Sequence, residues 1–230
     1  MNQQQKNTLY SCGLFCGITN SQTDSLLGCL GAREMRYEKN AVIWGMGNEV
    51  SACAVVLSGR VRAESVSASG ERILMASLSP GALVGDALMS SPDMKSPVCV
   101  IACEETELLY LSFHRIMGGC HCCCRWHTRL RENLVSEIAG KFWAQRQRTR
   151  YLCAKTLRQR IAMRLYDEYE KTGSLMFSLG GTREDLADYL GANRSALSRE
   201  IAKMKDEDIL DYYKDTFRIL SLEKLAREAN

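Results

Sequence analysis

Residues 118–127, with the sequence GGCHCCCRWH, bring together residue types that bind metals and undergo thiol chemistry. If this stretch is helical, Cys120, Cys124 and His127 lie at i, i+4 and i+7 and share one face. Seven residues of helix rise about 10.5 Å, whereas zinc–ligand bonds measure about 2.0–2.3 Å, so these three residues alone do not close around one ion. Buried cysteine also packs as a small hydrophobic side chain. The run therefore leaves three interpretations open: packing, thiol redox sensing, and metal or cluster binding.

Other signatures of catalysis are absent from the sequence. No P-loop, HExxH or G-x-S-x-G motif occurs. The eleven cysteines are an odd number, which fits a full disulfide framework poorly. No apolar run approaches the length of a membrane span, and the N-terminus lacks the apolar region of a secretory signal. We therefore expect a cytoplasmic protein that is not an enzyme and has no membrane partner, and the sequence identifies no cofactor.

Positive charge is concentrated in one segment of the chain. Residues 138–166 contain eight basic residues and no acidic one, although the whole chain has a net charge of only +3. A charge run is often a solvated helix face, but a segment this basic beside a domain boundary also suits a polyanion. The basic residues are Lys141, Arg146, Arg148, Arg150, Lys155, Arg158, Arg160 and Arg164.

We expect a β-rich region and a long helix to position the cysteine run and the basic segment. Residues 40–112 consist of short β-rich runs separated by glycines at turn-like spacing, which predicts a barrel or a double-sheet roll. From about residue 121 to 148 the apolar period becomes helical, with Leu130, Leu134, Ile138 and Phe142 in one stripe. A second copy of the chain could cover this stripe, or the stripe could pack on its own β-domain.

The segment 182–210, TREDLADYLGANRSALSREIAKMKDEDIL, is typical of a helix, a tight turn and a second helix. Thr182 and Asn193 are expected N-caps, with Asp185 completing a near-capping box after Thr182, and Gly191 supplies the turn. The expected buried residues are Leu186, Ala187 and Leu190 on the first helix, and Leu197, Ile201 and Met204 on the second.

The second of these helices is expected to expose small and basic residues. Arg194, Ser195, Ser198 and Arg199 lie on its outer side, and arginine can donate two hydrogen bonds to guanine O6 and N7 in the major groove. The alternative is a solvated helix of any α-hairpin. The following DYYKDTFRILSL alternates like a hairpin with a turn near residues 214–216, which predicts a wing.

The stretches VLSGRV, LSPGALVGD and TREDLADYLGANRSALSREI resemble the cyclic-AMP receptor protein/FNR family of bacterial transcription regulators. The resemblance implies an α+β fold with a cyclic-nucleotide-binding-like β-roll (jelly roll) at residues 1–120. A dimerisation helix would follow at 121–149, and a winged helix-turn-helix DNA-binding domain at 150–230.

The same resemblance implies a homodimer that binds a palindromic operator in double-stranded DNA, with RNA polymerase as a further candidate partner. The alternative is an effector-sensing or metal/redox-sensing module whose helix-turn-helix is a protein-contact surface. The sequence leaves open the effector, the operator, and whether the protein activates or represses. The implied DNA-binding residues are Thr182, Arg183, Asn193, Arg194, Ser195, Ser198 and Arg199.

Departures from the family pattern affect the expected ligands. Many members carry Glu where this chain has Ser195, so the base sequence of the DNA half-site is left open. Cyclic-nucleotide binders have Gly-Glu and Arg-Ser pairs, and here these read Gly85-Asp86 and Ser96-Pro97. Without the arginine, a cyclic phosphate loses its bidentate partner, and the neighbouring Lys95 is only a point charge on a flexible stem. We therefore expect cyclic AMP to bind weakly or not at all.

Two further expectations concern sensing. FNR-type oxygen sensors carry an N-terminal cysteine cluster, but the C-x3-C-x12-C spacing of Cys12, Cys16 and Cys29 is not that of the family. The effector pocket implied by the resemblance comprises Gly85, Asp86, Ser96, Gln145 and Arg146, and the metal or redox candidates are Cys120, Cys124 and His127.

Overall fold

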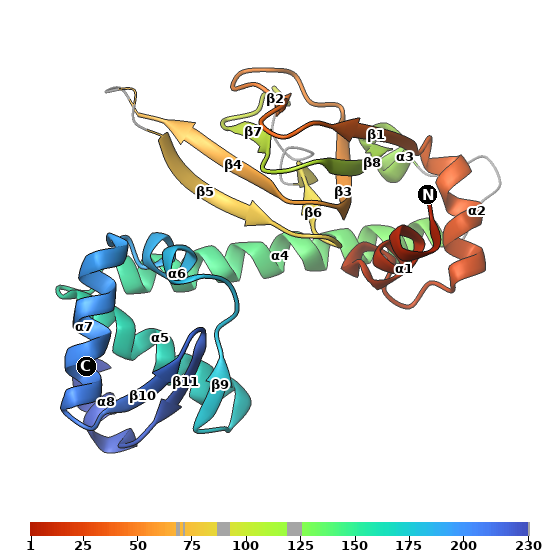
Figure 1. Ribbon diagram of the computed structural model, residues 1–230. Helices are drawn as coiled ribbons and strands as arrows, with labels where there is room; N and C mark the ends of the chain where they lie inside the picture. Colours follow the sequence, from red (N-terminus) through yellow and green to blue (C-terminus); the bar gives the residue numbers. More distant parts are fainter. Residues whose placement is uncertain (68–69, 71, 87–92, 119–125, 230) are drawn as a thin grey trace. The chain divides into compact units, whose positions relative to one another are not determined.

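The longest helix, α4 (Trp126–Leu152), contains the boundary between two packing units. The structure, a computed structural model, describes residues 1–67, 70, 72–86, 93–118 and 126–229 (Figure 1). The first unit ends at Lys141, the second begins at Phe142, and each has a buried core of its own. The functional domains expected at 1–120, 121–149 and 150–230 stay predictions, because packing units are defined by contacts and not by function.

Two four-stranded antiparallel sheets form the β-roll of the first unit, with strand orders β1-β8-β3-β6 and β2-β7-β4-β5. Apolar side chains of both sheets, including Val56, Val61 and Val100, meet in one core, which confirms the double-sheet roll expected from the sequence. The strands are β1 (Arg33–Tyr37), β2 (Val42–Trp44), β3 (Ala52–Ser58), β4 (Val61–Val66), β5 (Arg72–Leu78), β6 (Leu83–Val84), β7 (Cys99–Ala102) and β8 (Thr106–Ser112).

Three helical segments that were not predicted from the sequence precede the roll. They are α1 (Gln3–Ser11), the 3-10 helix η1 (Gly13–Phe15) and α2 (Asn20–Leu30). Asn2 and Thr19 begin the two α-helices as N-caps, each in a capping box with the glutamine three residues later. Gly31 ends α2 in the left-handed conformation that glycine adopts without strain.

These N-terminal helices share a core with the sheet β1-β8-β3-β6, with α3 (Phe113–Gly118) and with α4. The buried amide of Asn133 on α4 donates from Nδ2 to the carbonyl oxygens of Leu14 and Cys16, at 2.9 and 2.8 Å. Because both protons of one amide group are used in a buried site, Asn133 fastens the segment around η1 to α4.

The apolar stripe of α4 is divided between two environments. We expected Leu130, Leu134, Ile138 and Phe142 to form one seam. Instead, Leu130 and Leu134 are buried in the first unit and Ile138 packs partly against them, while Phe142 is exposed. The N-terminal helices cover the first half of the stripe, so a substitution such as Leu134→Asp would disrupt the unit's own core.

No helix in the described part of the chain combines the length and apolarity needed to cross a membrane.

The second unit contains the predicted winged helix-turn-helix. After α5 comes a three-stranded antiparallel sheet of order β10-β11-β9, with two helices between β9 and β10. Thr156 begins α5 as its N-cap, and Gly173 ends the helix in the left-handed conformation. The elements are α5 (Leu157–Thr172), β9 (Met176–Ser178), α6 (Arg183–Tyr189), α7 (Arg194–Asp206), β10 (Leu210–Tyr213), β11 (Thr216–Ile219) and α8 (Leu222–Ala229).

Candidate nucleic-acid interface

The two helices α6 and α7 are joined by a tight turn whose caps agree with the sequence prediction. Thr182 and Asp185 form a reciprocal capping box, in which each backbone N–H donates to the other residue's side chain. Asn193 caps α7 by accepting from the N–H of Ala196 at 2.8 Å. Gly191 has a φ of 61°, and a Cβ there would lie 2.7 Å from Leu152 Cδ2. The left-handed backbone and the nearby leucine therefore favour glycine at this turn.

The inner side of the two helices fixes which residues of α7 face outward. Leu197, Ile201 and Met204 are buried in the core of the second unit, as are Ala187 and Leu190 at the end of the preceding helix. Residues on the opposite side of α7 are consequently directed to solvent. The exposed residues of its first two turns include Arg194 and Arg199, the two expected base readers, and Ser195 and Ser198 beside them.

These four side chains differ in how firmly they are held. Ser195 Oγ donates to Asn193 Oδ1 at 3.0 Å, and Arg199 Nε donates to the Ser195 carbonyl oxygen at 3.3 Å. No contact with another described residue engages the guanidinium of Arg194. Both arginines therefore keep guanidinium N–H groups that can donate to a binding partner. The roles of all four residues stay a prediction.

Arg183, another predicted DNA contact, is instead engaged with the wing. Its guanidinium donates to the Lys214 carbonyl oxygen at 2.7 Å and lies 5.1 and 5.0 Å from the ring centroids of Tyr212 and Phe217. Burial lowers the pKa of this guanidinium. The hairpin turn itself falls at Lys214-Asp215, one of the two positions expected from the sequence.

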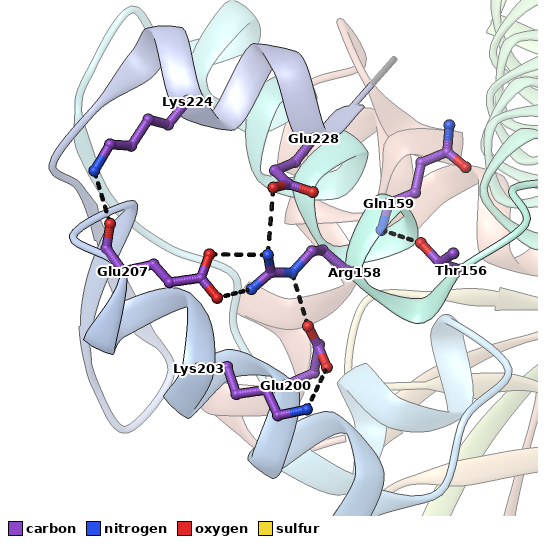
Figure 2. Close-up of polar contacts among 8 residues, drawn as sticks. All are labelled: Thr156, Arg158, Gln159, Glu200, Lys203, Glu207, Lys224 and Glu228. Carbon is purple, nitrogen blue, oxygen red and sulfur yellow. Dashed lines mark hydrogen bonds and ion pairs between the residues drawn. The ribbon is translucent and has the colours of Figure 1, made fainter.

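Arg158 joins three elements of this unit through carboxylates, as Figure 2 shows. From α5 it forms a bidentate pair with Glu207 at the end of α7, at 2.6 and 2.9 Å. Its Nε donates to Glu200 on α7 at 2.8 Å, and it reaches Glu228 on α8 at 3.3 Å. These hydrogen bonds raise the pKa of Arg158, while Arg158 lowers that of Glu207. One guanidinium therefore holds α7 to α5 and α8.

Most other basic side chains between residues 138 and 166 also have partners inside the protein. Arg148 and Arg160 donate to main-chain carbonyls of residues 188–191, at 2.9–3.2 Å, and so support the turn between α6 and α7. Arg150, Arg164 and Lys141 each form an ion pair within their own unit. The partners are Asp167 for Arg150, Glu168 for Arg164 and Asp86 for Lys141.

The sequence left open whether this segment is a solvated helix face or a surface for a polyanion. In the structure, six of its eight basic residues bind carboxylates or carbonyls of the chain itself. Within the described residues, the side chains of Arg146 and Lys155 have no such partner, and Arg146 lies 5.6 Å from the Trp143 ring centroid. The basic segment mainly holds helices in place.

Two of the predicted effector residues of the roll, Asp86 and Ser96, are buried and hydrogen-bonded within the protein. Asp86 is 3 % exposed, and its Oδ1 accepts from Lys141 Nζ at 2.7 Å, while its Oδ2 has no hydrogen-bond partner among the described residues. Ser96 is also buried, and its hydroxyl donates to the Val98 carbonyl oxygen at 2.7 Å. A Cβ on Gly85, whose φ is 80°, would lie 2.9 Å from the Trp44 ring. Lys141 of α4 is therefore the partner of the Asp86 carboxylate.

The other predicted ligand residues lie elsewhere. Gln145 and Arg146 belong to the second unit and are exposed on α4. Cys120 and Cys124 lie outside the described residues. His127 is buried, neither ring nitrogen has a hydrogen-bond partner in the described part of the chain, and burial lowers its pKa. The described residues contain no group of three potential metal ligands, and the metal or redox role of the cysteine run stays a prediction.

Two family models match the chain in the order of its units. The model described as "Cyclic nucleotide-binding domain" matches residues 34–118, and the model described as "Crp-like helix-turn-helix domain" matches residues 159–228. Together they cover more than half of the chain, including the roll and the winged helix-turn-helix.

Individual proteins agree with these models. An anaerobic regulatory protein of Aggregatibacter actinomycetemcomitans is 23% identical over 186 residues, which are 77% of this chain and 69% of that protein. Among solved structures, a CooA variant from Carboxydothermus hydrogenoformans matches with a TM-score of 0.68 and 22% identity, covering 90% of each chain. The regulator CLP of Xanthomonas campestris matches with a TM-score of 0.63 and 15% identity, over 88% of this chain and all of that one. Structural likeness at these identities shows the fold.

The Arg158 contacts predict a specific pattern of stability. Arg158→Met leaves three glutamates facing one another, so calorimetry on the full chain should show the second unit melting lower by about 5 °C at neutral pH. The pKa of Glu207 lies below its ordinary 4.5 in the folded protein. The stability that the Glu207–Arg158 pair contributes is therefore complete at pH values above the pKa of Glu207 in the unfolded chain. It is lost as the pH falls through the pKa of Glu207 in the folded protein. The difference between wild type and variant should shrink below about pH 4.5.

The matched control is Arg227→Met, which removes an exposed i,i+4 pair with Glu223 on α8. Such pairs contribute little, so this variant should melt like the wild type. Equal melting of Arg158→Met and wild type would contradict the structural role given to Arg158.

Proposed function

The protein belongs to the cyclic-AMP receptor protein/FNR family of transcription regulators, and we propose that it acts as a homodimer that binds a palindromic operator in double-stranded DNA. An effector sensed by the first unit would control this binding. The exposed first turns of α7 are the observation that carries the proposal, because they offer two arginines and two serines on a helix whose opposite side is fixed in a core. Helices of this kind enter the major groove by their N-terminal residues.

The two recognition arginines would read different base pairs. Arg194 and Arg199 are five residues apart, so their side chains leave the helix about 140° apart. Each is proposed to donate a bidentate pair of hydrogen bonds to a guanine, worth about 1–3 kcal/mol of discrimination. Thr182 and Asn193, as N-caps, would direct main-chain N–H groups of their helices toward phosphates. Arg183 would act by positioning the wing.

The homodimer is proposed from an exposed apolar surface on α4. Phe142 and Trp143, neighbours on the part of α4 in the second unit, are 60% and 61% exposed, and Val135, on the part of α4 in the first unit, is 66% exposed. Water-exposed aromatic and β-branched side chains in a helical row favour burial against a second copy. A dimer would also present two copies of α7, as a palindromic site requires.

A cyclic mononucleotide is not the effector that we propose. The hydroxyl donor of Ser96 is used within the roll, and the Asp86 carboxylate is an acceptor that repels a phosphate, so neither replaces the arginine that would bind a cyclic phosphate. The solved relative CLP is titled as responsive to c-di-GMP, which supports the view that this fold serves more than one signal. RNA polymerase stays a candidate partner, and binding DNA implies a place in the cytoplasm.

Selection of binding sites from random DNA tests the recognition-helix proposal. The wild type should enrich an inverted repeat, with half-sites about one helical turn apart. Arg194→Ala and Arg199→Ala should each relax one position per half-site and leave the others unchanged. If the wild type enriches no inverted repeat, or both variants enrich the wild-type motif, the helix-turn-helix is better explained as a protein-contact surface.

Sedimentation of full-length variants tests the dimer. Phe142→Asp places a charge in the proposed apolar seam and should convert a dimeric wild type into a monomer at micromolar concentration. Met176→Asp is the control, because Met176 is similarly exposed but lies on β9. A wild type that sediments as a monomer, or a Phe142→Asp variant that remains dimeric, would exclude this seam.

Calorimetric titration with 3′,5′-cyclic AMP tests the effector argument. Binding should be weak or undetectable, because no arginine is available for the phosphate. A cyclic-AMP-binding relative titrated with the same nucleotide solution serves as the positive control. A Kd of about 1 µM or below for this protein would contradict the argument.

A further inference from the structure

The outer face of the sheet β2-β7-β4-β5 carries a pocket that the proposed function does not use. Along β4, Val61 and Ala63 face the core of the roll, so Arg62 and Glu64 face the other way. The pocket has a volume of about 350 Å³, which lies within the range of small-molecule sites. It is separate from the interior of the roll, where Gly85, Asp86 and Ser96 lie.

Charge in this pocket is unbalanced. Glu64 is almost fully buried, and Arg62 and Arg72 lie on either side of it, with nitrogen–oxygen distances of 2.7 and 3.6 Å. These are the only charged residues among the described lining residues, so the described lining carries a net charge of +1. One monoanion would neutralise it.

The guanidinium groups also have unused hydrogen-bonding capacity. The Nε of Arg62 is close to Glu64 Oε1, but its N–H is not directed at the oxygen, and this buried donor has no hydrogen-bond partner among the described residues. The side chain of Arg72 is 66% exposed and touches Glu64 only at the longer distance. The Arg62 Nε is itself buried beside Glu64, so a ligand would accept from the more accessible guanidinium of Arg72 and from the Nη groups of Arg62, whose side chain is 32% exposed.

Three apolar side chains, those of Val42, Val66 and Ile101, form much of the remaining wall, together with Asn40 and Cys99. The strand register places Val42 beside Ile101 and Ile101 beside Arg62 on this face, and Val66 lies beside Arg72 at the end of the β4–β5 pair. Val42 and Val66 are 57% and 48% exposed. A hydrocarbon chain on this surface would remove apolar area from water while leaving its head near the arginines.

We propose that this outer pocket binds one small monocarboxylate with a short hydrocarbon chain per protein chain. The carboxylate accepts hydrogen bonds from Arg62 and Arg72, and the chain lies against Val42, Val66 and Ile101. Carboxylate is favoured over phosphate because a dianion exceeds the single positive charge available. The site is additional to the proposed DNA-binding function and does not depend on it.

Calorimetry with the full-length protein in the absence of DNA tests the site. Sodium hexanoate should bind with a stoichiometry of one per chain. Sodium acetate, which lacks the chain, and 1-hexanol, which lacks the charge, should each bind at least about tenfold more weakly. Inorganic phosphate should bind no better than acetate.

Two variants and a control locate the binding. Arg72→Gln and Val66→Asp, both at exposed positions, should weaken hexanoate binding by about tenfold or more. Arg36→Gln should not change it, because Arg36 is an equally exposed arginine, paired with Glu107, on the other sheet. The proposal is overturned if hexanoate does not bind, if hexanol binds as tightly as hexanoate, or if Arg72→Gln and Val66→Asp both bind like the wild type.

Discussion

The guanidinium of Arg158 is the contact on which the presentation of α7 depends. Hydrophobic packing through Leu197 and Ile201 determines which side of the helix is buried, but apolar contacts are not directional. The bidentate pair with Glu207 and the bond to Glu200 add that direction, since each requires a defined geometry. A helix held at its far end in this way can offer its N-terminal side chains in a fixed orientation, which reading base pairs requires.

Directional hydrogen bonds of guanidinium groups also engage most of the basic segment at residues 138–166. In the second unit, arginines of α4 and α5 bind carboxylates and main-chain carbonyls, several of them at the turn before α7. Charge that would otherwise add sequence-independent attraction to DNA is used to order the protein. The proposed specificity then rests on a small number of exposed donors, chiefly those of Arg194 and Arg199.

The sequence predicted elements with strong local signals. Thr182, Gly191 and Asn193 mark caps and a turn that backbone geometry demands, and the structure agrees at each. The N-terminal helices were missed, although Asn2 with Gln5 and Thr19 with Gln22 are capping boxes visible in the sequence. The partners of Arg158, 42–70 residues away along the chain, could not be foreseen. Likewise, no local pattern reveals that Leu130 and Leu134 pack against segments more than a hundred residues earlier.

The central claim is that α7 presents Arg194 and Arg199 to DNA while Arg158 and Arg164 remain bound within the protein. Resonances of the arginine Nε–Hε groups, recorded by NMR with and without a selected operator duplex, test this directly. The account predicts large shifts for Arg194 and Arg199, with those of Arg158 and Arg164 nearly unchanged. Shifts at Arg158 and Arg164 with none at Arg194 and Arg199 would contradict it.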